Sequence, residues 1–139
     1  MTFRQLNLRL LAMTMFITVA IIALAACGDP KGQAPAIVVA FDPNFPPPTS
    51  LDTGAYAGIA AILTNDTGSG NVTWTCAPAN QCGSFSPNII HTAVPTCYLA
   101  PDAVPSGKSV TVTARSVTDT TKSISATITI LSGPGQACP

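Results

Sequence analysis

The sequence contains no glutamate, one histidine and one tryptophan, and only 9% of its 139 residues are charged. Six basic residues balance six acidic ones, so no basic surface is available to neutralise phosphates, which disfavours nucleic acids as partners. Glutamate and lysine, which favour helices, are absent or scarce, whereas threonine, which suits exposed strand faces, is abundant. The composition therefore predicts an all-β protein whose exposed strand faces carry hydroxyl groups.

The motifs of common enzyme classes are also missing. The chain has no Gly-x-Ser-x-Gly nucleophile element, no glycine-rich phosphate loop after an expected strand and no paired carboxylates within a motif. His91 lies in an expected loop without a nucleophile and an orienting acid around it, so a solvated histidine is a simpler interpretation than a catalytic base. We expect a protein that is not an enzyme, with no catalytic residue, no cofactor and no metal ion.

The N-terminal segment has the three features of a secretory signal. Residues 1–9 include Arg4 and Arg9 and no acid, residues 10–23 are almost wholly apolar, and small residues follow. A membrane-spanning helix needs about 20 apolar residues, and this run is at the short limit for one. We therefore expect residues 1–26 to be a signal peptide.

The tetrad Leu24-Ala25-Ala26-Cys27 resembles the lipobox of bacterial lipoproteins, in which the cysteine is lipidated and becomes the new N-terminus. An ordinary Ala-x-Ala cleavage site and an uncleaved anchor are the alternatives, but neither explains a cysteine at this position. Two or more acyl chains on Cys27 would anchor the protein stably to a membrane without a spanning helix. We expect a bacterial envelope lipoprotein facing the periplasm or the cell surface. Lipoproteins that are retained at the inner membrane carry an aspartate directly after the lipidated cysteine. Here Gly28 follows Cys27 and the aspartate, Asp29, comes one position later, so the outer membrane is favoured.

Beyond the anchor, the sequence predicts one β domain. Residues 27–35 form a lipidated cysteine and flexible tether, residues 36–132 form the domain and residues 133–139 form a tail. The expected strands are 36–41, 56–64, 71–76, 83–87, 96–101, 109–115 and 123–130. We expect a turn at 51–54 and a loop at 88–95. About seven short strands with regularly spaced turn signals favour a β-sandwich.

Period-two alternation identifies the expected core. It places Trp74, Val110, Val112 and Ile128 inside, and Tyr98 is expected in the core as well. In the expected strand 56–64, the same period puts Ile59, Ala61 and Leu63 on one face.

Other apolar and aromatic residues are candidates for binding. Trp74 or Tyr56 would suit a stacked carbohydrate, although a tryptophan in the third strand of a sandwich is more often a core residue. Four apolar residues fall in expected loops and would form a partner surface if they were contiguous. They are Phe45, Ile89, Ile90 and Leu99.

The cysteines are expected to form disulfides. Five are present, and lipidation of Cys27 leaves four in an exported chain. Cys76 and Cys82 enclose a tight loop and are the best pair. Cys97 with Cys138 then follows by elimination and would tie the tail to the domain.

Two metal sites are weighed as alternatives. A site of Cys76, Cys82, Cys97 and His91 lacks the Cys-x-x-Cys spacing and would need free thiolates in an oxidising compartment. The loop 65–71 offers oxygen donors for Ca²⁺ but lacks the closing acidic ligand of an EF-hand, so a polar turn is the simpler interpretation.

Five stretches of the domain, taken together, form a further pattern. They are Val72–Cys76, Cys82–Pro87, Tyr98–Pro101, Pro105–Gly107 and Val110–Ala114. Together they resemble a bacterial immunoglobulin-like domain of the kind found in invasin- and intimin-type surface proteins, over residues 35–131. The resemblance implies an immunoglobulin-like sandwich without catalytic residues, used as a structural, adhesion or protein-interaction module. A single copy and the extra Cys97 depart from the family pattern, and a carbohydrate- or ligand-binding accessory domain is the alternative function.

Overall fold

The computed structural model describes residue 32 and residues 34–135. The chain divides into two units, residues 1–34 and residues 35–139, and all strands belong to the second. The expected signal peptide 1–26 and Cys27 lie outside the described residues. In the part that is described, the structure has no helix, and so none long and apolar enough to cross a membrane. The domain is all-β, as the composition predicts.

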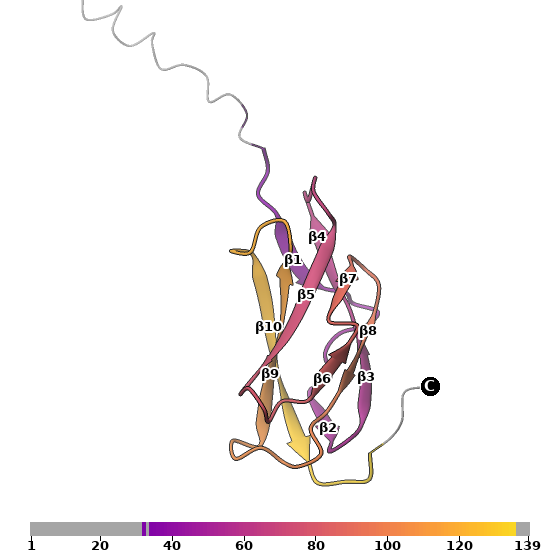
Figure 1. The fold of residues 1–139 in the computed structure, drawn as a ribbon. Helices are drawn as coiled ribbons and strands as arrows, with labels where there is room; N and C mark the ends of the chain where they lie inside the picture. The colour runs from indigo at the N-terminus through magenta and orange to yellow at the C-terminus, as the bar shows by residue number, and fades with distance from the viewer. Residues whose placement is uncertain (1–31, 33, 136–139) are drawn as a thin grey trace, which may run out of the picture. The chain divides into compact units, whose positions relative to one another are not determined.

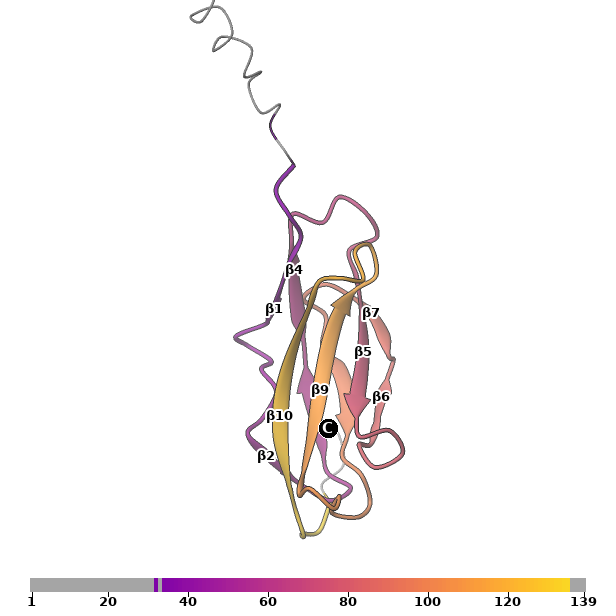
Figure 2. The same ribbon diagram turned by 90° about the vertical axis from the view of Figure 1, so that its left-hand side faces the viewer.

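Ten strands form three sheets in the described residues. They are β1 (Val38–Phe41), β2 (Ser50–Asp52), β3 (Tyr56–Ile59), β4 (Ala61–Thr64), β5 (Asn71–Ala77), β6 (Ser84–Ser86), β7 (Ile89–His91), β8 (Thr96–Leu99), β9 (Ser109–Ser116) and β10 (Ser123–Leu131). The sheets have the orders β1-β4, β2-β10-β9-β5-β7 and β3-β8-β6. Figure 1 shows β9 and β10 on one side of the domain and β3 and β8 on the other, and Figure 2 shows the same strands turned by 90°. The arrangement is sandwich-like, because side chains of all three sheets share one core.

A row of aromatic rings runs through this core. Phe41 of β1 stacks on Trp74 of β5 at 6.3 Å between ring centroids, Trp74 stacks on Phe85 of β6 at 5.7 Å, and Phe85 meets Tyr98 of β8 at 5.1 Å. Trp74 and Tyr98 are 2% and 0% exposed. The four rings therefore join all three sheets, and aromatic contacts of this kind stabilise a core beyond the burial of their area.

The closing strands follow the expected alternation. Val110, Val112 and Ala114 of β9 are buried, and so are Ile128 and Ile130 of β10, while the residues between them are half-buried or exposed. All five residues expected in the core from the sequence lie in it. Burying a valine or isoleucine contributes about 1.5–3 kcal/mol, so these two strands supply a large part of the core.

The prediction of one strand over 56–64 is wrong. The segment forms β3 and β4, which belong to different sheets, with Ala60 between them. The Ala60 N–H donates to the Phe45 carbonyl oxygen, and the Ala60 carbonyl accepts from the Asp42 N–H, both at 2.9 Å. Residues after β1 therefore pair with the chain at Ala60, and the strand passes from one sheet to another there.

Two expected irregular segments contain strands. Residues 51–54 were expected to be a turn, but β2 pairs in parallel with the end of β10, with Asp52 opposite Leu131. Residues 88–95 were expected to be a loop, but β7 pairs with the start of β5. The domain thus has ten strands where about seven are expected, because each of these three-residue strands is stabilised by a longer neighbouring strand.

The predicted disulfide between Cys76 and Cys82 is confirmed, with 5.7 Å between their Cα atoms. Cys97 is also disulfide-bonded, whereas Cys138 lies outside the described residues. The pairing of Cys97 with Cys138 stays a prediction.

Candidate functional site

The loops of the domain gather at its two ends (Figure 1). At the end where β1 begins, the β4–β5 loop meets the β9–β10 turn, and the Thr118 hydroxyl donates to Asp66 Oδ2 at 3.2 Å. The opposite end carries the disulfide loop and two depressions. We call it the distal end; it comprises residues 50–56, 77–83, 101–108 and 131–135.

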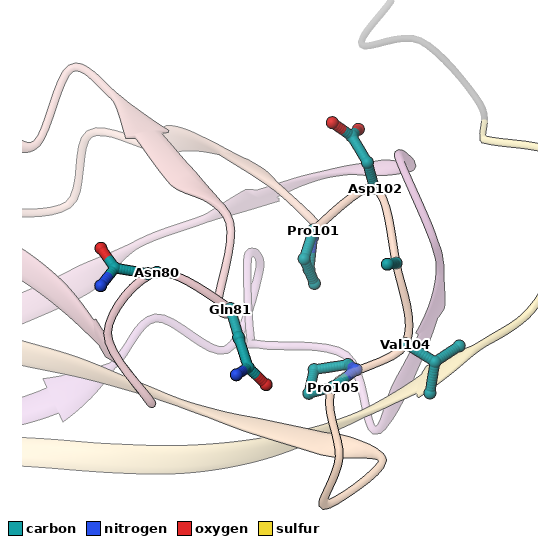
Figure 3. Close-up of a pocket in the computed structure, with 7 residues that line it drawn as sticks. Asn80, Gln81, Pro101, Asp102, Val104 and Pro105 are labelled. Carbon is teal, nitrogen blue, oxygen red and sulfur yellow. The ribbon is translucent and has the colours of Figure 1, made fainter.

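The first depression has a volume of about 330 Å³ and lies between the disulfide loop and the β8–β9 loop. Gln81 extends towards Pro105, whereas Asn80 and Asp102 turn away from the space between the loops (Figure 3). One polar side chain therefore reaches into a space with mainly apolar walls. This arrangement suits a shallow contact better than a small polar ligand, which needs several converging polar groups.

The disulfide loop is held in one conformation by several local features. Besides the Cys76–Cys82 bond, the Gln81 N–H donates to the Pro78 carbonyl oxygen at 3.2 Å. Gly83 follows with φ +85°, and a Cβ at this position would collide with the Leu99 carbonyl group. Only glycine suits such a position. The loop therefore presents its exposed residues without a large ordering cost on binding.

Tyr98 fixes the base of this loop from inside the core. Its hydroxyl is buried and donates to the Cys82 carbonyl oxygen at 2.6 Å. Burial raises the pKa of Tyr98 from 10.0 to about 12, because the phenolate would lose its hydration. The hydroxyl thus stays protonated and remains a donor at physiological pH.

The second depression has a volume of about 300 Å³ and lies between β2, the start of β3 and the end of β10. It is lined by Ser50, Leu51, Asp52, Ala55, Tyr56 and Leu131. Tyr56 is 38% exposed and Leu131 is 47% exposed. Asp52 is half-buried, and among the described residues its carboxylate has neither a hydrogen bond nor an ion pair. The depression therefore combines an aromatic ring, an aliphatic wall and an unpaired carboxylate.

The turn between β2 and β3 joins the two depressions. The Gly54 N–H donates to the Pro101 carbonyl oxygen at 3.1 Å, and the Ala100 N–H donates to the Ala55 carbonyl oxygen at 2.9 Å. Asp52 belongs to the lining of the second depression and Asp102 to that of the first, although the Asp102 side chain turns away from the space (Figure 3). The two depressions thus belong to one continuous end of the domain.

The two aromatic residues that the sequence offers for carbohydrate binding, Trp74 and Tyr56, differ in exposure. Trp74 is 2% exposed, so it lies in the core and offers no face to a ligand, whereas Tyr56 is exposed beside the second depression. The four apolar residues expected in loops divide between two sheets. Phe45 lies next to Gly58 of β3, and Leu99 is on β8, but Ile89 and Ile90 are on β7.

His91 and the loop 65–71 lie away from both depressions. His91 is exposed on β7, with Nδ1 3.3 Å from the Thr92 carbonyl oxygen. In the loop, Asp66 accepts hydrogen bonds from the Gly68 N–H and the Thr118 hydroxyl. The Asp66 carboxylate is thus engaged within the protein. Across residues 32 and 34–135 the structure brings together no group of three or more metal-ligating side chains.

Asp52 and Gln81 carry no clear signal in the sequence. Asp52 was expected in a plain turn, and its depression is built from strands about 80 positions apart, as the hydrogen bond from Thr53 to the Gly133 carbonyl oxygen shows. Gln81 lies inside the loop predicted from the cysteine spacing, which is the one local signal that marks it. The lipidation site Cys27 lies outside the described residues.

A scan against models of protein families, a search of curated proteins and a search of solved structures each find no match to this chain.

Proposed function

We propose that this chain is a non-enzymatic bacterial lipoprotein whose immunoglobulin-like domain serves as a structural, adhesion or protein-interaction module of the envelope. The observation that carries the proposal is the division of the domain into two ends. The domain begins at the end where β1 begins, and the disulfide loop lies at the opposite end (Figure 1). The residues that line both depressions belong to this opposite end. A chain anchored at Cys27 would present the distal end to partners.

The strand order supports an immunoglobulin-like assignment. In such domains strands C, F and G are neighbours in one sheet, and a buried tryptophan lies on strand C. Here β5, β9 and β10 are neighbours, and Trp74 is buried on β5. The assignment departs from the family pattern in two respects. The disulfide closes a loop instead of joining strands B and F, and the strand before β5 is divided into β3 and β4.

The size of the depressions favours recognition through loops and edges. Volumes of about 300 and 330 Å³ are at the small end of the range for ligand pockets. Loops that a rigid sheet scaffold holds in place are common binding elements, and exposed strand edges can pair with extended partners. A protein partner is therefore our first choice.

The intact mass of the protein from a bacterial host tests the anchor. We expect cleavage before Cys27, added acyl chains and a gain of about 4 Da on reduction, two hydrogens for each of two disulfides. A gain of half this size would leave Cys97 and Cys138 unpaired with each other. An unmodified full-length mass would contradict the lipoprotein proposal, whatever the domain binds.

A carbohydrate-binding role is the second candidate. The observation that favours it is the position of Tyr56, whose exposed ring lines a depression together with Ser50 and Asp52. Aromatic faces and hydroxyl or carboxylate acceptors are the groups on which a sugar can stack and form hydrogen bonds. If this role is correct, soluble glycans will bind and Tyr56→Ala will abolish the binding, while the exposed Phe45→Ala will not.

A further inference from the structure

We propose that the second depression binds the cationic side chain of an arginine or a lysine presented by an extended segment of a partner protein. The inference rests on the proposed interaction role and names the chemistry of its recognition. It is carried by four features of the depression: an unpaired carboxylate, an aromatic ring, fixed backbone geometry and an adjacent open strand edge.

The carboxylate of Asp52 supplies the charge. It is half-buried, lines the depression and is paired with no hydrogen-bond donor or cation in the part of the chain that the structure describes. Partial burial strengthens the attraction of a charge for its partner, because less water screens it. The other residues of the lining carry no charge. The one charge among the lining residues is therefore negative, and no cation of the described residues is paired with it.

The remaining walls suit the rest of a long cationic side chain. Tyr56 offers a partly exposed ring on which a guanidinium or an ammonium group can lie. Leu131, which is 47% exposed, offers aliphatic surface for the methylene stem, which long basic side chains bury while their charged ends meet polar groups. A volume of about 300 Å³ is suited to one such side chain and its surroundings, not to a large ligand.

The geometry is fixed before any ligand arrives. The parallel pairing of β2 with β10 places Asp52 opposite Leu131, and the Thr53 N–H donates to the Leu131 carbonyl oxygen at 2.9 Å. The Ala55 N–H closes the turn on the Asp52 carbonyl oxygen at 3.1 Å. Gly133 leaves just enough room for the Asp52 carboxylate, since a Cβ there would lie 2.5–2.7 Å from its carboxyl atoms. Little ordering cost then opposes binding.

An open strand edge favours a protein over a free cation. β2 is the edge strand of the five-stranded sheet, so an extended segment can lie along it, and the depression begins at its residues Ser50 and Asp52. Binding along an edge combines main-chain pairing with pockets for alternate side chains. The pocket next to β2 would select the basic residue of such a segment.

Titration of the ¹⁵N-labelled full chain in a neutral detergent tests the inference. The probes are the blocked amino acids Nα-acetyl-argininamide and Nα-acetyl-lysinamide, with Nα-acetyl-norleucinamide as the neutral control. We expect the amide signals of Asp52, Tyr56 and Leu131 to shift with the two cationic probes, and the shifts to shrink as salt is added. Equal shifts with the neutral probe, or no shift at these residues, would overturn the inference.

Paired variants separate the site from general attraction to acidic residues. Asp52→Asn should weaken binding of the arginine probe by up to about fivefold, the upper limit for an exposed ion pair. Asp102→Asn removes the same charge from the other depression and should leave binding unchanged. An equal loss in both variants would show nonspecific attraction and refute the site.

Tyr56→Leu keeps the bulk and removes the ring, and should weaken binding by about twofold to fivefold. N-Acetylglucosamine, which is uncharged, serves as a further probe, and shifts with this sugar but with neither cationic probe would refute the inference in favour of the carbohydrate role. Because none of these titrations depends on lipidation, failure of the site and failure of the anchor are read from different measurements.

Discussion

Tyr98 connects the core to the distal end through one hydroxyl group. Its pKa is raised to about 12 by burial, which means that the folded state favours the protonated phenol more than the unfolded state does. The stabilisation is fully present below pH 10.0, the usual pKa, and is lost as the pH rises towards 12. We expect the free energy of unfolding to fall by about 2 kcal/mol over this interval on account of this group.

Denaturant unfolding between neutral and alkaline pH measures this loss. Tyr98→Phe should abolish this part of the pH dependence and should cost about 0.5–1.5 kcal/mol at neutral pH, because the buried Cys82 carbonyl oxygen loses its donor. Tyr56→Phe, at the exposed tyrosine, is the matched control. A wild-type pH profile in Tyr98→Phe would contradict the assignment.

At the scale of single residues, the sequence predicts the inside of the domain better than its surface. Period two decides which face a side chain occupies, and it places Trp74 and Val112 correctly. The same reasoning gives no role to Asp52, whose neighbours Tyr56 and Leu131 are brought together only by the parallel pairing of β2 with β10. Residues that are brought together by such long-range pairing form no recognisable motif in the sequence.

At the scale of elements, strand length decides what the sequence predicts. β9 and β10 are eight and nine residues long and alternate regularly, so they are found with nearly their true ends. β2 and β7 have three residues each, too few for a periodic signal, and exist because a neighbouring strand supplies their partners. The sequence does not predict the division of 56–64 into β3 and β4 for a similar reason. Ala60, at the division, forms its backbone hydrogen bonds with Asp42 and Phe45, which are distant in the sequence.

The disulfide loop is the element with the clearest stability prediction. Replacing both Cys76 and Cys82 with serine should lower the free energy of unfolding by about 2 kcal/mol, because the unfolded chain gains the entropy of a short loop. Urea denaturation under oxidising conditions measures this, with the other disulfide left intact. Ala79→Ser, at an exposed position of the same loop, should change stability by less than about 0.5 kcal/mol. An unchanged midpoint in the double variant would show that the loop does not depend on the bond.

At the scale of the whole domain, three sheets share one core, and this predicts one cooperative unfolding transition. Phe85 lies between Trp74 and Tyr98 in the row of rings, so it contacts strands of two different sheets. Phe85→Ala should therefore lower the free energy of unfolding by about 2–4 kcal/mol. It should move the fluorescence transition of Trp74 and the far-ultraviolet dichroism transition together, since small domains unfold as one unit.

Phe45→Ala provides the matched control, because this phenylalanine is 41% exposed and is not part of the row of rings. It should shift both transitions only slightly. If Phe85→Ala moved the Trp74 fluorescence while the dichroism transition stayed in place, the sheets would be unfolding separately. The distal end would then be only as rigid as its own turns and disulfide, and a recognition surface built on a fixed scaffold would lose its physical basis, since β2 and β3 of the second depression belong to different sheets.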